Sequence, residues 1–238
     1  MLKIENVVLP SPEQWEAVIR GMRNPKNSWA LSDSYTTHME SANTGETTDY
    51  AHFVGKKDHK LMTDLAKGGP VHAKYRRMIP VYLDITAPLY WWKEFDTYKV
   101  GTVCNSCSTM HKIQVKEFTL DDFSWEHIFD ATNCPHDGFL HFDAEGHEDE
   151  PIVLFNIIID ALNHYRKRYL ETKDKRYWWQ MIQLLPSSYN QKRTIMLNYE
   201  VLVGIYKWRR DHKLDEWHVF CDWIEQLPYS ELITGEDA

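Results

Sequence analysis

Ala87–His111 reads APLYWWKEFDTYKVGTVCNSCSTMH. Its first half predicts a helix, because Thr86 is a suitable N-cap and Pro88 stands where a missing backbone N–H costs nothing. We expect Gly101 to end this helix. The small hydrogen-bonding residues that follow, from Thr102 to Thr109, are typical of a loop that wraps a polar small molecule. A solvated helix followed by a plain surface loop is the alternative.

The composition indicates a globular chain with a sizeable core. It has 238 residues, of which 13 % are aromatic, and a net charge of −8. A broad basic face is therefore excluded, and we expect no nucleic-acid partner. No apolar run is long enough to cross a bilayer and the start, MLKIE, is not a signal peptide, so we expect a cytoplasmic protein without a membrane partner. Four cysteines without a secretory signal favour a reducing compartment and no disulfide framework.

Hydrophobic periodicity predicts an α+β fold in a single domain spanning residues 1–238, with a small central sheet and flanking helices. Strands are expected at residues 3–9, 78–85, 113–118 and 193–197. Pro80 suggests that the second of these is an edge strand or carries a bulge. Helices are expected to begin near residues 11, 58, 86, 119, 151, 177, 198 and 215. Ser11-Pro12-Glu13-Gln14 is a capping box, Asp58, Asn198 and Asp215 are further capping residues, and Pro151 opens the helix near residue 151.

Two polar segments show no period. Residues 28–50 are rich in Ser, Thr, Asn and Asp, and we expect a long loop there. Residues 131–150 form a polar insert with three histidines among many carboxylates. The part from His141 to Glu150 is compatible with a divalent metal site, but a solvated acidic loop is favoured.

The cysteines offer a further alternative. Cys104 and Cys107 form a C-x-x-C pair, which occurs in zinc sites and in redox pairs. The only other close pair is Cys134 with His136, and its spacing is poor for a structural zinc site. The C-x-x-C also follows a helix and a glycine, whereas redox pairs usually follow a strand and open a helix. We therefore expect no metal site.

Arg209 is the charged residue that most favours a functional role. It follows Leu202 by seven residues and so shares a helical face with Leu202, Ile205 and Tyr206. An arginine on an apolar face needs an anionic or carbonyl partner.

The C-terminal part carries a series of short motifs: Leu185-Pro186, Asn198-Tyr-Glu-Val-Leu202, Trp208-Arg209 and Glu216-Trp217. They resemble the signature of flavin-dependent thymidylate synthases, which is Leu-Pro, a strand, Asn-x-Arg-x-Leu, Leu-Arg and Gln-Trp-Glu. This chain has one extra residue between Arg209 and Trp217. Ala87-Pro88 matches the residues before the family's Arg-His-Arg helix, and His72 matches the His of its His-x-x-Pro segment. The order of elements agrees over most of the chain.

The resemblance implies a homotetramer that holds FAD at its subunit interface and methylates a uridine monophosphate reductively, with methylenetetrahydrofolate as carbon donor and NADPH as hydride donor. It implies that Arg209 pairs with the pyrimidine ring. The implied flavin contacts are His72, Lys74, Tyr98, Lys99 and Asn198. The implied nucleotide contacts are Lys93, Glu94, Asn105, Ser106, Cys107, Ser108 and Thr109.

Several family residues are replaced. The Arg-His-Arg triplet reads Thr97-Tyr98-Lys99, and the Arg of Asn-x-Arg is Glu200. The Ser-x-Arg-Tyr reads Cys107-Ser108-Thr109-Met110, the Arg before Leu-Pro is Ile182, and Lys74 stands for the Ser or Thr of the flavin-contacting loop. Because bidentate arginines are the usual phosphate ligands, lysines and hydroxyls must shape a different pocket here.

Three functions therefore compete. The first is a flavin-dependent, thymidylate synthase-like enzyme. The second is a non-catalytic nucleotide-binding or structural oligomer on the same scaffold, which the replaced triplet favours. The third is a zinc protein that uses Cys104, Cys107, Cys134 and His136.

Overall fold

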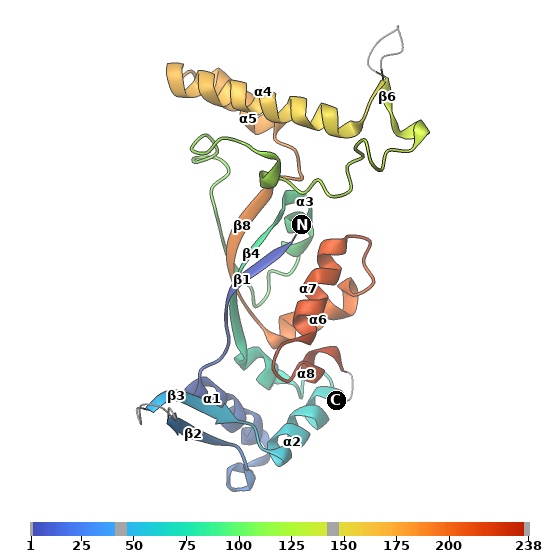
Figure 1. Cartoon of the computed structure of the whole chain (residues 1–238). Coiled ribbons are helices and arrows are strands. Elements are labelled where there is room, and N and C mark those ends of the chain that lie inside the picture. Colours follow the sequence, from blue (N-terminus) through green and yellow to red (C-terminus); the bar gives the residue numbers. More distant parts are fainter. Residues whose placement is uncertain (1, 41–46, 142–147, 236–238) are drawn as a thin grey trace. The chain divides into compact units, whose positions relative to one another are not determined.

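The computed structural model describes residues 2–40, 47–141 and 148–235 (Figure 1). The chain divides into two compact units. Unit 1 comprises Met1–Lys3, Thr86–Phe95 and Ser106–Arg193. Unit 2 comprises Ile4–Ile85, Asp96–Asn105 and Thr194–Ala238. Among the described residues no helix is both long and apolar enough to cross a membrane.

A four-stranded sheet has the strand order β1-β4-β8-β5. Its strands are β1 (Lys3–Val8), β4 (Pro80–Pro88), β5 (Val103–Ser106) and β8 (Asn190–Asn198). The α+β class and the small sheet are thus confirmed, and the extent of the single domain stays a prediction. Pro80 opens β4, which has neighbours on both sides, so the edge-strand interpretation was wrong; proline is tolerated at the first residue of a strand.

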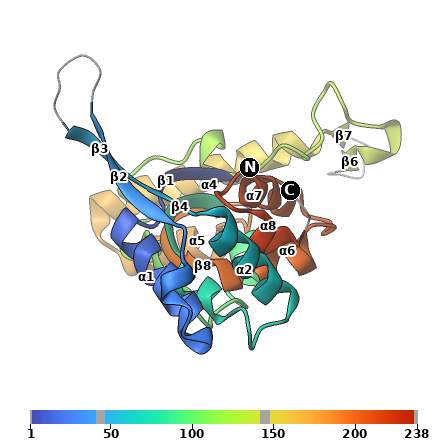
Figure 2. The same ribbon diagram turned by 90° about the horizontal axis from the view of Figure 1, so that it is seen from below.

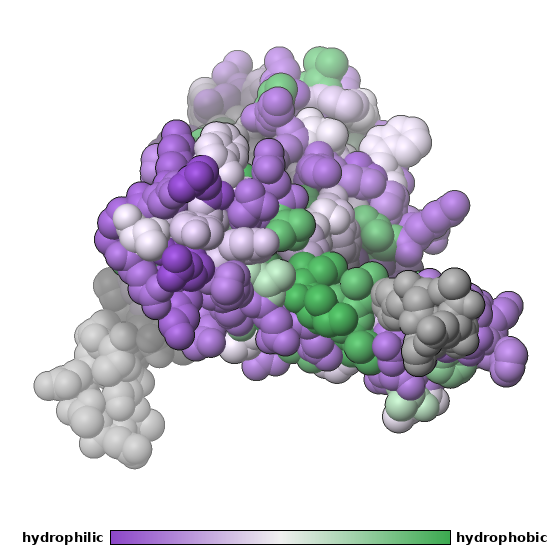
Figure 3. All heavy atoms as spheres, turned by 90° about the horizontal axis from the view of Figure 1, so that it is seen from above, coloured by the Kyte–Doolittle hydropathy of each residue, from purple (hydrophilic) through white to green (hydrophobic). Residues whose placement is uncertain are grey.

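Unit 1 is built around α4 (Pro151–Thr172), which packs beside α5 (Lys175–Leu184) (Figure 1). Both helices were predicted, and Pro151 occupies the first helical turn. The apolar core of this unit consists of Ile113, Phe118, Phe123, Phe155, Ile159, Leu162 and Met181. Figure 3 shows further apolar side chains gathered on the outer face of α4, where Leu154 and Ile157 are exposed.

Three predictions for unit 1 and its borders are corrected. Helix α3 (Leu89–Phe95) stops well before Gly101, and the exposed run after it contains strand β5 where a loop was expected. The segment from Ile113 to Phe118 is not a strand. Its last backbone amide instead pairs with a helix side chain, because Phe118 N donates to Asn163 Oδ1 (2.8 Å) and Asn163 Nδ2 donates to Phe118 O (2.8 Å).

In the remaining polar segments of unit 1, the described residues form only short elements. The helix expected near residue 119 is a single 3-10 turn, η4 (Leu120–Asp122), which Thr119 caps. The insert holds a 3-10 turn, η5 (His136–Gly138), and a small hairpin of β6 (Leu140–His141) and β7 (Glu148–Asp149). Residues 142–147, and with them His147, lie outside the described residues.

In unit 2, α1 (Pro12–Arg23) begins with the predicted capping box: Ser11 N donates to Gln14 Oε1 (2.8 Å), and Gln14 N donates to Ser11 Oγ (3.3 Å). The loop expected at 28–50 is wrong, because it contains β2 (Tyr35–Glu40) paired antiparallel with β3 (Thr47–Phe53). Figure 2 shows this hairpin beside α1. Thr and Tyr favour strands, but in residues 35–53 polar residues interrupt the alternation of apolar and polar residues that would have predicted them.

The rest of unit 2 is helical. After two 3-10 turns, η1 (Asn24–Lys26) and η2 (Trp29–Leu31), the chain continues through the hairpin to α2 (Lys56–Lys67) and η3 (Lys74–Met78). The C-terminal helices are α6 (Tyr199–Arg209), α7 (Asp215–Glu225) and α8 (Glu231–Thr234). The core includes β4 residues and the buried faces of these helices, among them Met62, Leu83, Leu202, Ile205, Trp217 and Phe220.

A buried ion pair joins the first two helices of unit 2. Asp58 was expected to cap α2, but it lies inside the first turn of the helix, where Asp33 accepts its backbone N–H. Its carboxylate accepts from Arg23 Nε (2.5 Å) and from the hydroxyls of Ser32 (2.6 Å) and Ser34 (2.7 Å). Burial alone would raise the pKa of Asp58, but these hydrogen bonds outweigh it and hold the pKa below its usual value.

Candidate functional site

A cleft of about 380 Å³ lies in unit 2, between the turn that follows α3 and the start of α6. We call it the cleft. It is lined by Arg77, Thr97, Tyr98, Lys99, Val100, Gly101, Asn198, Glu200, Val201 and Gly204. Its size falls within the range of small-molecule sites.

The turn and the helix fit together closely because two residues allow it. Asn198 ends β8 and caps α6, its Oδ1 accepting from Val201 N (3.1 Å). Gly101 has φ +82°, and a Cβ at this position would lie 3.1 Å from both Asn198 Nδ2 and Val201 Cγ2. Only glycine suits this backbone conformation and this approach. The predicted cap at Asn198 is confirmed, and its side chain is engaged in the cap itself.

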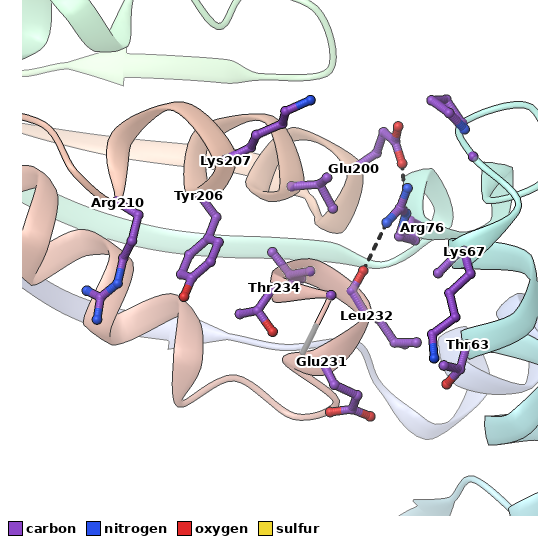
Figure 4. Close-up of a pocket in the computed structure, with 16 residues that line it drawn as sticks. Thr63, Lys67, Arg76, Glu200, Tyr206, Lys207, Arg210, Glu231, Leu232 and Thr234 are labelled. Atoms are coloured by element: carbon purple, nitrogen blue, oxygen red, sulfur yellow. Dashed lines mark hydrogen bonds and ion pairs between the residues drawn. The ribbon is translucent and has the colours of Figure 1, made fainter. Parts of the chain in front are cut away.

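The charges around the cleft favour an anion. Arg77 and Lys99 are exposed and basic. Glu200 is the acidic lining residue, and its Oε2 accepts from Arg76 Nε (2.9 Å). The Arg76 side chain is only 7 % exposed, so it neutralises Glu200 in a position where water screens little. The negative charge of Glu200, which replaces the arginine of the family motif, is therefore compensated by Arg76, and Figure 4 shows the two side chains with the hydrogen bond between them. Arg77 and Lys99 then give the lining of the cleft a net positive charge.

Gly204 leaves the cleft open on the side of α6. It lies in the helix interior, where a Cβ would meet nothing within 4 Å. Glycine lowers helix stability by about 1 kcal/mol relative to alanine, so its presence here costs stability and provides space.

Arg209 lies next to the cleft residue Tyr98 but does not line the cleft. Its Nε donates to Tyr98 Oη (2.9 Å), and its guanidinium carbon lies 5.6 Å from the centre of the Tyr98 ring and 4.8 Å from that of Trp217. Both aromatic faces attract a cation. The half-buried Arg209, which the sequence analysis selected, thus has the phenol of Tyr98 and the indole of Trp217 as partners. Tyr98 belongs to the segment at 97–101.

The other predicted site residues are dispersed. Tyr98, Lys99 and Asn198 come together in the cleft. His72, beside Gly68, and Lys74 are exposed residues of unit 2 that do not line it. The same holds for Asn105, which is exposed in β5. The remaining ones belong to unit 1: Lys93, Glu94, Ser106, Cys107, Ser108 and Thr109.

The predicted phosphate loop is structured from within unit 1. Cys107 N donates to Lys192 O (2.9 Å), and Cys107 O accepts from Gln191 Nε2 (2.7 Å). Ser108 Oγ accepts from His111 N (2.9 Å). These bonds hold the loop beside the start of β8. Its role toward a nucleotide stays a prediction.

Sequence reasoning missed Arg77 and Gly204. Arg77 follows a second arginine in the run Lys74–Met78, and nothing in the spacing indicates which of the two enters the cleft. Gly204 did offer a signal, since a glycine inside an apolar helix marks a close approach or a needed space.

No three His, Cys, Asp or Glu side chains of the described residues come together as metal ligands. Cys104 and Cys107 are exposed and Cys134 is half-buried, and none of the three forms a disulfide.

The fold is that of the flavin-dependent thymidylate synthases, as the following solved structures show. Thymidylate synthase X from Helicobacter pylori, crystallised with FAD and dUMP, superposes with a TM-score of 0.59 at 16% identity, over 99% of this chain and 97% of that chain. The UMP/dUMP methylase PolB from Streptomyces cacaoi, bound with 5-Br dUMP, gives 0.59 at 14% identity, over 99% and 95%. Its structure with 5-Br UMP gives 0.58 at 12% identity, with the same coverage. No family model and no curated protein matches the sequence.

Proposed function

We propose that the protein binds FAD in the cleft and transfers a one-carbon unit reductively to C5 of a uridine monophosphate. The observation that carries this proposal is the cleft itself. It is lined by residues 97–101 and by Asn198, Glu200, Val201 and Gly204. The sequence resemblance aligns the first segment with the flavin-contacting triplet and the start of the second with the Asn-x-Arg motif.

The lining residues fit part of a flavin nucleotide. Arg77 and Lys99 supply positive charge for its phosphates, and Gly101 and Gly204 leave room for a flat ring. When bound, the flavin supplies hydride chemistry, and the protein binds and orients. The cleft is smaller than a whole FAD, which agrees with the flavin lying at a subunit interface, and we propose a homotetramer.

Arg209 is the proposed catalytic residue. Tyr98 and Trp217 hold its guanidinium in a fixed position, which suits a group that must meet a flat heterocycle in one orientation. We propose that it pairs with the pyrimidine and favours its ionised form. Methylenetetrahydrofolate as carbon donor and NADPH as hydride donor follow from the same resemblance.

The first test is the absorption spectrum of the purified protein, before and after addition of FAD. We expect visible flavin absorption that stays with the protein through gel filtration, at an elution volume of a tetramer. A protein that stays colourless after FAD is added excludes this function. The second test is thymidylate formation from dUMP with FAD, methylenetetrahydrofolate and NADPH, which Arg209→Ala should abolish.

A second candidate is a non-catalytic nucleotide-binding oligomer on the same scaffold. It is favoured by the replacement of an arginine of the family signature by Glu200. The carboxylate of Glu200 is paired with Arg76, so Arg76 is already engaged in neutralising it. A melting-temperature screen with FAD, dUMP, dTMP and folate separates the two. A ligand at 100 times its Kd stabilises by about 2.7 kcal/mol, so stabilisation by a nucleotide but not by FAD would favour the second candidate.

A further inference from the structure

Helix α4 carries apolar side chains on two of its faces. Phe155, Ile159 and Leu162 are buried and belong to the core of unit 1. Leu154 and Ile157 are exposed on the outer face of the helix, where Figure 3 shows an apolar patch. A surface helix needs one apolar face to pack on its own subunit, so the second apolar face is available for another contact.

The residues of this second face follow a regular spacing along the chain. They stand alternately four and three positions apart: Glu150, Leu154, Ile157, Ala161, His164 and Arg168. This is the spacing of a helix that packs along its length against another helix. We call these six residues the α4 seam. None of them is buried, so the core of unit 1 does not use them.

The α4 seam is complementary to itself when two copies of the helix run antiparallel. A two-fold axis level with position 159 places Ile157 of one copy against Ala161 of the other, a large side chain against a small one. The same axis places Leu154 of one copy against the ring of His164 of the other. Each pairing occurs twice about the axis, so the apolar centre of the seam is covered over its whole length.

The charges at the two ends of α4 favour the antiparallel direction. Residues 148–150 are Glu, Asp and Glu and come directly before the helix, whereas residues 166–168 are Arg, Lys and Arg and lie near its end. The two-fold axis places Glu150 of one copy against Arg168 of the other. Two parallel helices would instead bring like charges together and align their dipoles.

Arg168 also has contacts within its own chain. Its Nη1 lies 3.0 Å from Glu171 Oε2, and its guanidinium carbon lies 5.4 Å from the centre of the Tyr177 ring. The side chains of Arg168 and Glu171 are 42 % and 46 % exposed, and such exposed ion pairs contribute little to stability. Because a guanidinium has five N–H donors, Arg168 can keep these contacts and still meet a carboxylate of a second copy.

We propose that the α4 seam is an interface between two copies of this chain, in which two α4 helices pack antiparallel about a two-fold axis. The helix has 22 residues, so the contact is a strip about 33 Å long. The inference goes beyond the proposed homotetramer by naming the residues of one interface and their register. It needs no flavin and no nucleotide, so it does not rest on the proposed reaction.

The test is sedimentation velocity of the purified protein, without added FAD, at several concentrations. We expect the unmodified protein to sediment as an oligomer. Leu154→Lys places an ammonium group in the apolar part of the seam and should weaken the association by about tenfold or more, which appears as a smaller species at equal concentration.

Leu170→Lys is the matched control. Leu170 lies on the same helix but outside the seam, and it is 38 % exposed, as Leu154 is. The two variants therefore have the same net charge and a comparable change in exposed surface. Leu170→Lys should change the association by less than about twofold, and melting curves show whether both variants are folded.

A charge exchange tests the antiparallel register. Glu150→Arg sets two arginines against each other and should weaken the association. Adding Arg168→Glu restores opposite charges across the axis and should recover most of the loss. Positions 150 and 168 are about 27 Å apart along one helix, so such a recovery cannot arise within a single chain.

Three results would overturn the proposal. One is an unmodified protein that stays monomeric at about 50 μM, which would assign the apolar face to a different partner. Another is equal association of Leu154→Lys and Leu170→Lys. The third is a charge exchange that recovers nothing, which would exclude the antiparallel contact. Because each readout is the mass of the particle, none of these results depends on whether the protein binds FAD.

Discussion

Replacing Gly204 with alanine or leucine separates the stability of α6 from the ligand capacity of the cleft. Gly204 lies inside the helix, and a Cβ there would meet nothing within 4 Å. Helix propensity therefore acts without a steric penalty. Glycine is less favourable than alanine by about 0.8–1.0 kcal/mol in a helix interior, so Gly204→Ala should stabilise the protein by about that amount.

In a chain of this length, such a gain raises the melting temperature by about 2–4 °C. Gly204→Leu should keep most of the gain, because leucine is also a strong helix former. Its side chain, however, extends into a cleft of only about 380 Å³. We expect it to exclude the flat ring of the flavin and weaken FAD binding by at least about tenfold, which corresponds to about 1.4 kcal/mol.

The assay combines thermal unfolding with titration of flavin fluorescence. Val203→Leu is the matched control, since Val203 is the preceding residue of α6 and does not line the cleft. A Gly204→Leu protein that binds FAD with unchanged affinity would refute the assignment of the cleft. A Gly204→Ala protein that melts below the unmodified one would refute the description of Gly204 as a position with open space.

Three further predictions concern Asp58 and Tyr98. Asp58→Ala leaves the guanidinium of Arg23 buried without the carboxylate that neutralises it. The free energy of unfolding, measured with urea, should fall by about 3–5 kcal/mol. A fall of less than about 1 kcal/mol would contradict the buried ion pair. Because folding lowers the pKa of Asp58, the carboxylate stabilises the folded protein above its unfolded pKa, and this stabilisation is lost as the pH falls through the folded pKa. The difference in free energy of unfolding between the unmodified protein and Asp58→Asn should therefore shrink on acidification. A difference that does not depend on pH would contradict this. Tyr98→Phe removes one hydrogen bond from Arg209 but keeps the aromatic ring. The free energy of unfolding should fall by about 1 kcal/mol or less, while the affinity for dUMP should fall about fivefold. An unchanged affinity for dUMP would argue against the positioning of Arg209 by Tyr98.

Elements with local signals were predictable from the sequence. The capping box at Ser11, the proline that opens α4 and the cap at Asn198 each involve residues within one helical turn, so the chain needs no tertiary information to define them. The β2–β3 hairpin lacked such a signal, because polar residues interrupt the alternation of apolar and polar residues along its sequence.

Other features depend on residues far apart in the chain. The segment before η4 carries strand-like residues, yet Asn163, 45 positions away, satisfies the backbone of Phe118 and no strand forms. The pairing of Glu200 with Arg76 spans 124 positions. From the sequence, Glu200 was only a departure from a motif; its neutralisation by a buried arginine depends on the tertiary fold.

For the cleft, the resemblance to a family located Tyr98, Lys99 and Asn198. It also pointed to Arg209, which contacts Tyr98 from outside the cleft. Arg77 could not be identified from the sequence, because its neighbour Arg76 has the same side chain. In the structure Arg76 is buried against Glu200, whereas Arg77 is exposed and lines the cleft. Motif spacing identifies positions along an element, whereas burial is decided by what packs against it.

The most direct measurement of the central claim is photolabelling with 8-azido-FAD, followed by mass mapping of the labelled peptides. If the cleft is the flavin site, the label should lie in peptides that contain residues 97–101 and 198–204, and excess FAD should suppress it. Label confined to peptides of α2 and α8, or of α4, would contradict the account.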